Sequence, residues 1–230
     1  MRIEIQNRPA YAMAQVHLAG GESIVSEGGA MVSMSDNVTV STSTFAAPGS
    51  GGMGALVKGL KRMLTGESFF MNKFTASGEG HVILAPVLVG DVEHIPMDGS
   101  VNVIVQSSSY LAASGGITTD TQFSGLKGFF SGESVFWIKC SGAGDLIINA
   151  FGGIFHIDVD GTFICDTGHI AAFEDTLDYK VKKVGGWKST ILSGEGLVTE
   201  FSGRGRLYMQ THNSGEFGRY IGRKLPPRRQ

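Results

Sequence analysis

Short apolar runs separated by glycine-rich turns dominate the chain. Residues 30–35 alternate apolar with small polar side chains, which is the two-residue period of a half-buried β-strand. Residues 81–85 and 145–149 are continuous apolar runs with the length of a buried strand. Asp-Gly pairs at 98–99 and 160–161 are typical of tight hairpin turns. The pattern predicts an all-β protein, a sandwich or a barrel.

One segment shows helical rather than strand spacing. Apolar residues recur along residues 54–64 so that they share one helix face: Leu56, Leu60, Met63 and Leu64. Gly54 and Gly59 lower the helix propensity of this segment. We therefore expect at most one short amphipathic helix there.

Three similar blocks follow one another in the same order. The blocks begin at 59, 125 and 186, each contains a Gly-Glu pair at 66, 132 or 194, and a Gly-x-Gly triplet follows at 78, 142 and 203. The other half of each unit is an apolar run that precedes a second one: 24–25 before 30–34, 103–105 before 110–113, and 163–165 before 169–173. One lysine and one glutamate recur in each block: Lys61, Lys127, Lys188, Glu67, Glu133 and Glu195. The self-similarity predicts three copies of one β unit of about 60 residues.

The repeats define the expected organisation of the chain. One compact domain covers residues 1–215, with repeats at about 20–95, 96–157 and 158–213, and a basic tail covers residues 216–230. Each small β unit leaves open strand edges, which invite pairing with a neighbour. We therefore expect a homo-oligomer, most simply a symmetric trimer.

The repeated blocks also carry a family resemblance. The Leu-Lys-x-x-x-Ser/Thr-Gly-Glu-Ser blocks, Ala-Met-Val-Ser-Met at 30–34 and residues 160–171 resemble the altered-inheritance-of-mitochondria family, from about Ile3 to Asn213. The resemblance implies tandem copies of a short double-stranded β-helix, similar to the tryptophan RNA-binding attenuator protein, and a trimer. It implies no established activity for the bacterial members, and for the fungal mitochondrial member a link to inner-membrane organisation. It defines no catalytic or cofactor-binding residues.

Composition and cysteine use narrow the function classes. A net charge of -2 gives no basic footprint of a DNA-binding domain, and the 42% hydrophobic content argues against disorder. Cys140 and Cys165 lie in apolar runs, which predict buried thiols and suit a reducing compartment. The sequence shows no signal peptide, transit peptide or long apolar span. We expect a soluble, cytoplasmic protein of the bacterial type.

Candidate chemistry in the sequence is weak. Residues 49–58 resemble a phosphate loop, but Gly59 follows Lys58 where a Walker loop needs Ser or Thr. His156, Asp158 and Asp160 would share one strand face and could bind a divalent metal, although a polar strand face that ends in an Asp-Gly turn is the commoner reason for such a pattern. The six histidines show no triad spacing, and no Gly-x-Ser-x-Gly elbow occurs. We predict no enzyme, no cofactor and no metal.

The C-terminal tail is the one strongly basic segment. It holds five of the 19 basic residues: Arg219, Arg223, Lys224, Arg228 and Arg229. Pro226 and Pro227 end any regular element. Such a tail is either solvated or contacts RNA or anionic lipid.

Three functional hypotheses follow. The first is a non-enzymatic, self-associating scaffold or interaction protein for an unknown protein partner or a membrane surface. The alternative is a small-ligand or RNA-binding ring like the attenuator protein, for which each repeat should contribute basic or aromatic residues. The third is a metal-dependent enzyme around His156.

Overall fold

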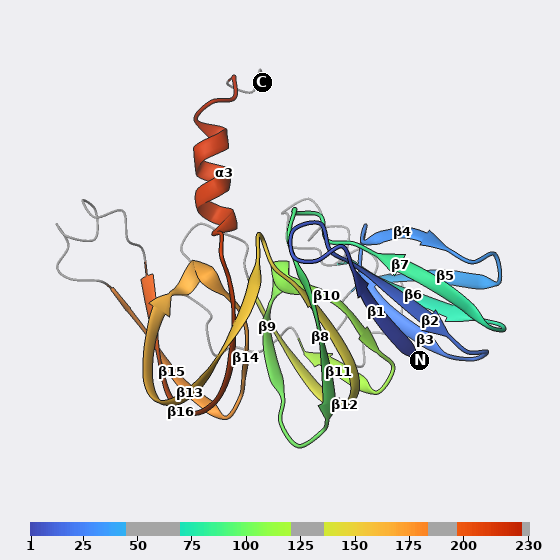
Figure 1. Cartoon of the computed structure of the whole chain (residues 1–230), viewed down its shortest axis with the longest axis horizontal. Coiled ribbons are helices and arrows are strands. Elements are labelled where there is room, and N and C mark those ends of the chain that lie inside the picture. The colour runs from blue at the N-terminus through green and yellow to red at the C-terminus, as the bar shows by residue number, and fades with distance from the viewer. Residues whose placement is uncertain (45–69, 121–135, 184–196, 227–230) are drawn as a thin grey trace, which may run out of the picture.

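The structure is a computed structural model that describes residues 1–44, 70–120, 136–183 and 197–226. Antiparallel strands make up most of the described chain (Figure 1), so the predicted all-β class is confirmed. The helix expected at 54–64, the loop at 49–58 and the three Gly-Glu blocks lie outside these residues.

The strands fall into three consecutive groups along the chain. The first group contains β1 (Arg2–Gln6), β2 (Met13–Leu18), β3 (Ser23–Glu27), β4 (Met31–Met34), β5 (Val38–Thr44), β6 (Phe70–Ala76) and β7 (Gly80–Leu84). The second contains β8 (Val92–Asp98), β9 (Val103–Gln106), the 3-10 turn η1 (Ser107–Ser109), β10 (Tyr110–Ser114), β11 (Ile117–Asp120) and β12 (Trp137–Asn149). The third contains β13 (Ile154–Asp166), η2 (Thr167–His169), β14 (Ile170–Glu174), β15 (Leu177–Lys183), β16 (Leu197–Gln210) and the helix α3 (Ser214–Gly222).

Strand pairing follows the same plan in each group. In the first group β2 pairs with β7 and β3 with β6, in the second β8 and β9 both pair with β12, and in the third β13 pairs with β16. A short strand then joins the other edge: β4 on β7, β10 on β12 and β14 on β16. Its register shifts by one residue at the corresponding place each time, after Met31, Tyr110 and Ile170.

The short strands also connect neighbouring groups. β10 pairs with β3 of the first group, and β14 pairs with β9 of the second. Figure 1 shows the result: the first group lies at one end of the long axis and the third group at the other.

Three apolar clusters form a core that runs through all groups. Ile24, Phe74 and Leu84 of the first group pack in one cluster with Leu111 of β10. In the third cluster the centre of the Phe173 ring lies 5.6 Å from the centre of the Trp137 ring, and Trp137 belongs to β12. Each cluster thus contains side chains from a neighbouring group. Neighbouring groups therefore bury apolar surface against each other.

The turn predicted at Asp160-Gly161 is wrong. Both residues lie inside β13, where Asp160 pairs with Arg204 and Gly161 with Gly203. Gly161 and Gly203 have φ angles of 110° and 112°, so the paired strands deform together and continue. At the corresponding place in the second group the chain does turn, between β8 and β9, where Gly99 has a φ of 86°.

Candidate functional site

The C-terminal helix α3 is the element that sequence reasoning missed. It begins after Asn213, whose side-chain oxygen accepts hydrogen bonds from the amides of Gly215 and Glu216 at 3.0 and 3.2 Å. Three glycines in the helix hide its pattern: Gly215, Gly218 and Gly222. The Asn cap, followed by apolar residues at 217, 220 and 221, is the signal that predicts it.

No residue of α3 is buried, and the helix stands away from the strands (Figure 1). Its first turn contacts the strand-rich part of the chain, because the centre of the Phe217 ring lies 5.0 Å from the centre of the Phe151 ring. Among the described residues, no helix has the length and apolarity needed to cross a membrane.

An exposed apolar stripe runs along one side of α3 and past its end. We call it the C-terminal stripe, and it consists of Phe217, Tyr220, Ile221 and Leu225. Phe217 is 45% exposed and Tyr220 is 61% exposed, so both rings meet water over much of their surface. Spacing of three and four residues places the three helical members on one face.

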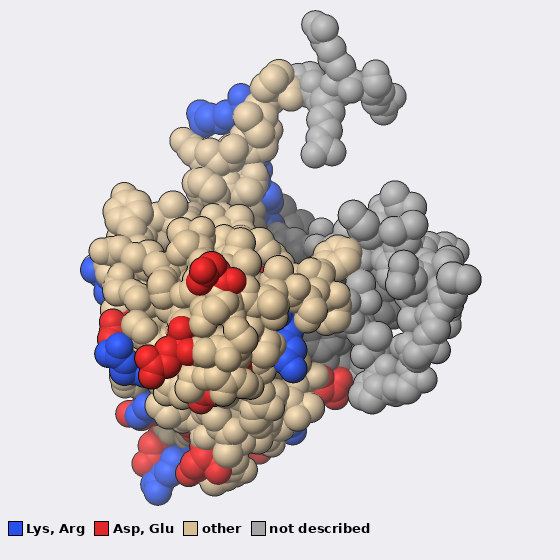
Figure 2. Space-filling view, turned by 90° about the vertical axis from the view of Figure 1, so that its right-hand side faces the viewer, with Lys and Arg blue, Asp and Glu red and all other residues tan. Residues whose placement is uncertain are grey.

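Three of the five predicted basic residues accompany this stripe. Arg219 lies 3.6 Å from Glu216, and the Lys224 amine lies 5.3 Å from the centre of the Tyr220 ring. Arg223 is exposed at the end of the helix. Figure 2 shows basic side chains on the projecting helix, away from the mixed charges of the body. Arg228 and Arg229 lie outside the described residues.

The acidic residues of the candidate metal face on β13 form ion pairs with arginines of the neighbouring strand β16. His156, Asp158 and Asp160 are all exposed on β13. Arg206 donates to Asp158 at 2.8 Å, and Arg204 donates to Asp160 at 2.9 Å. The hydrogen bond from Arg206 lowers the pKa of Asp158. Within the described ranges, no three His, Cys, Asp or Glu side chains converge as a metal site would require.

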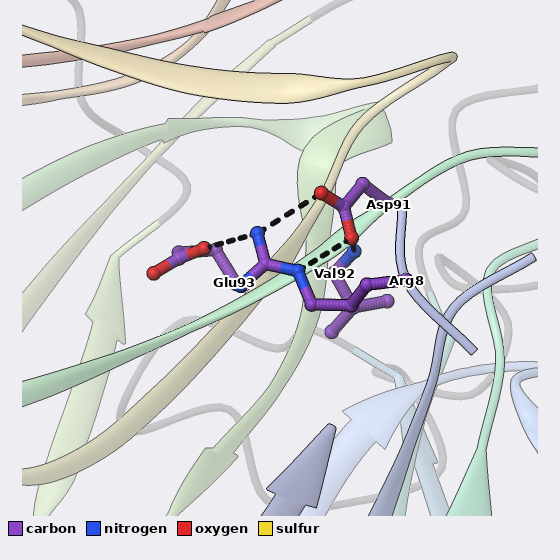
Figure 3. A network of polar contacts seen from close by, with 4 residues as sticks. All are labelled: Arg8, Asp91, Val92 and Glu93. Carbon is purple, nitrogen blue, oxygen red and sulfur yellow. Dashed lines mark hydrogen bonds and ion pairs between the residues drawn. The ribbon is translucent and has the colours of Figure 1, made fainter. Parts of the chain in front are cut away.

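An ion pair between the partly exposed Arg8 and the buried Asp91 joins the N-terminal loop to the residue before β8 (Figure 3). Asp91 is only 2% exposed, and Arg8 donates to both its carboxylate oxygens at 2.9 Å. Arg8 also reaches Glu93 at 2.7 Å, and the Val92 amide donates to Asp91 at 2.9 Å. The hydrogen bond to Asp91 raises the pKa of Arg8. These contacts engage both carboxylate oxygens of Asp91. The network therefore holds the loop that contains Arg8 against the start of β8, and Asp91 is not an unpaired reactive group.

The two cysteines behave as the sequence predicts. Cys140 and Cys165 are free and buried. Burial raises the pKa of each thiol to about 12, so both stay protonated near neutral pH. Neither is a candidate nucleophile.

Comparisons with known proteins agree with the fold and place the chain in a family. The model of the mitochondrial biogenesis AIM24 family matches residues 3–212. An uncharacterized protein of Streptococcus pyogenes is 31% identical over 230 residues, which cover 98% of this chain and 92% of the relative. An X-ray crystal structure of a Streptococcus pyogenes protein is similar with a TM-score of 0.78 and 29% identity, covering 97% of this chain and 99% of the other. The chain therefore belongs to the mitochondrial biogenesis AIM24 family.

Proposed function

We propose that the protein is a non-enzymatic, self-associating scaffold whose C-terminal helix docks onto an anionic membrane surface. The observation that carries this proposal is the C-terminal stripe, an unburied apolar face accompanied by Arg219, Arg223 and Lys224. A helix with an apolar face and cationic side chains binds the interface of a bilayer without crossing it.

The energetics of α3 favour a docking role. A helix of nine residues with three glycines is marginal in water when no side chain is buried. Lying in a membrane interface would bury the stripe and add about 1 kcal/mol for each basic residue near the anionic surface. Several helices in one oligomer would add avidity, since each further contact is intramolecular.

The remaining polar sites support a role without catalysis. Arginines engage Asp91, Asp158 and Asp160, and both thiols are protonated and buried. Free thiols suit a reducing compartment, and we propose the cytoplasm.

Vesicle co-sedimentation tests the membrane proposal. The full chain is mixed with phosphatidylcholine vesicles, with or without phosphatidylserine, at low and high salt. We expect binding to the anionic vesicles that weakens with salt, as for any contact between exposed charges. Phe217→Ser with Tyr220→Ser should abolish binding, and Arg219→Glu with Arg223→Glu should abolish it as well. The matched control is Lys73→Glu with Lys180→Glu, which makes the same charge change at exposed sites on the strands and should bind normally.

Two results would overturn this proposal. One is the absence of sedimentation with anionic vesicles at low salt. The other is retention of single-stranded RNA on a filter, lost in the Arg219→Glu, Arg223→Glu variant, without vesicle binding. That result would favour the alternative of an RNA-binding ring protein.

A further inference from the structure

Two loops of the N-terminal part of the chain expose apolar side chains to water. Residues 7–12 connect β1 to β2, and residues 85–91 connect β7 to β8. Val87 is 78% exposed and Tyr11 is 76% exposed, more than any other large apolar residue that the structure describes. Val89 is 57% exposed. We call Tyr11, Val87 and Val89 the loop patch.

The segment that carries both valines has no polar side chain. Residues 85–90 read Ala-Pro-Val-Leu-Val-Gly, and residues 9–12 add Pro, Ala, Tyr and Ala. Single apolar residues are common on protein surfaces, but a contiguous apolar surface in water marks an interaction site. These loops therefore present a partner with apolar surface and, from the Tyr11 ring, one hydroxyl group.

The backbone of these loops is paired within the chain. The Ala12 amide donates to the Gly90 carbonyl oxygen at 3.0 Å, and the Gly152 amide donates to the Val89 carbonyl oxygen at 3.1 Å. Gly90 is required for this close fit, because an added Cβ would lie 1.7 Å from the Ala150 carbonyl oxygen. A loop whose polar backbone groups are already paired loses fewer hydrogen bonds when its side chains leave water.

The ion pair of Arg8 with Asp91 joins the two loops (Figure 3). Arg8 lies in the first loop, and Asp91 is the last residue of the second. Arg8 also pairs with Glu93, so one cation binds both carboxylates that lie next to the loop patch in the sequence. This cation lowers the repulsion between these carboxylates and an anionic surface.

The loop patch lies on the same side of the molecule as α3. Gly90 forms a bridge with Gly152, and the neighbouring Phe151 ring contacts the Phe217 ring of the helix. In Figure 1 the loops lie along the upper side, from which α3 projects. Because no residue of α3 is buried, a change in the angle of the helix exposes little apolar surface. The helix can therefore lie along a surface that the loop patch also meets.

We infer that the loop patch enters the same anionic phospholipid bilayer that α3 binds. The Tyr11 ring then lies at the level of the headgroups, and Val87 and Val89 reach the boundary of the acyl chains. A protein interface would need a polar rim, for which residues 85–90 have no side chain. This inference rests on the proposed function, since it takes the bilayer as the partner of α3. The second contact fixes the orientation of the protein, because a single helix leaves the protein free to rotate about it.

Fluorescent labelling of single added cysteines tests the inference in the full chain. Tyr11→Cys and Val87→Cys each carry an environment-sensitive nitrobenzoxadiazole probe, and the native thiols stay unlabelled because they are buried. We expect the emission to rise with vesicles that contain phosphatidylserine, and to be quenched by lipids with a nitroxide on the acyl chain. The matched control is Val40→Cys on β5, which is exposed but lies outside these loops, and its emission should not change.

Polar replacement measures how much the loop patch contributes to binding. Val87→Ser with Val89→Ser should weaken vesicle binding roughly tenfold, since the two side chains no longer gain by leaving water. Val40→Ser is the control and should bind like the natural chain. All three valines are exposed, so the variants should fold normally.

Four outcomes contradict the inference. Probes at 11 and 87 that stay in water while the chain binds vesicles would remove the loop patch from the interface and leave docking by α3 intact. Unchanged binding of the double serine variant would have the same meaning. Emission that rises with protein concentration without vesicles would show that a protein surface covers the loops. Absence of vesicle binding by the natural chain would overturn both the inference and the proposed membrane docking.

Discussion

β4 and β10 hold the same place in their strand groups but meet opposite environments. Both are short edge additions with a one-residue register shift, and both are rich in apolar or small residues. Every residue of β4 is exposed, whereas every residue of β10 is buried. The difference comes from the neighbour: β10 has β3 on its outer side, and β4 has no second strand there among the described residues. Whether such a short strand is buried therefore depends on whether another group places a strand beside it.

Shortening the corresponding apolar side chains of β10 and β4 should give the largest difference in the free energy of unfolding between the two strands. Leu111 of β10 is fully buried, so Leu111→Ala should lower the free energy of unfolding by about 2–5 kcal/mol. Val32→Ala at the matching position of β4 should change it by less than about 0.5 kcal/mol in the dissociated chain. Denaturant unfolding at low protein concentration measures both, and equal losses would contradict the comparison.

The Gly-x-Gly triplets offer a second contrast between the same two groups. Gly142 has a φ of 110°, and an added Cβ would lie 2.4 Å from the Gly116 carbonyl oxygen. Gly78 begins the matching triplet of the first group, and a Cβ there would meet only the Asn37 side chain at 3.3 Å. Gly142→Ala should therefore cost about 1–3 kcal/mol for the strained backbone alone, and Gly78→Ala less than about 1 kcal/mol. Thermal unfolding of both variants tests this, and a larger loss for Gly78→Ala would refute it.

A third contrast concerns the last residue of β3 and of β9, which is Glu27 in one and Gln106 in the other. Burial raises the pKa of Glu27 from 4.5 to about 7. The folded state therefore holds this proton more tightly than the unfolded state. The stability from Glu27 is fully present below pH 4.5 and is lost as the pH rises to about 7.

Glu27→Gln places in β3 the residue type that β9 has at the matching position, and it should remove this pH dependence. Above pH 7 the variant should be more stable than the natural chain by on the order of 2 kcal/mol, since its amide needs no proton to stay neutral. Denaturant unfolding at pH 5 and pH 8 gives the comparison. The same decline with pH in both proteins would assign it to another residue.

Sequence patterns predicted the parts of this fold that depend on local chemistry. The alternation at 30–35 and the run at 81–85 became β4 and β7, because side-chain period and chain length decide whether a strand forms. The Asp-Gly pair at 160–161 misled the prediction, since its glycine deforms a continuous strand when a second glycine lies opposite. Helix α3 was missed because its glycines weaken the pattern that its Asn cap supports.

The sequence by itself determined the β class, the family and the basic C-terminal segment that carries the proposed interaction residues. Only the tertiary structure decided that Arg8 meets Asp91 across 83 positions, and that Met31–Met34 lies on an open edge while Tyr110–Ser114 lies in the core. The physical reason is that a strand's hydrogen bonds and buried area come from strands far away in the chain. Two segments with similar side chains can therefore end in water or in the core according to which strand lies beside them.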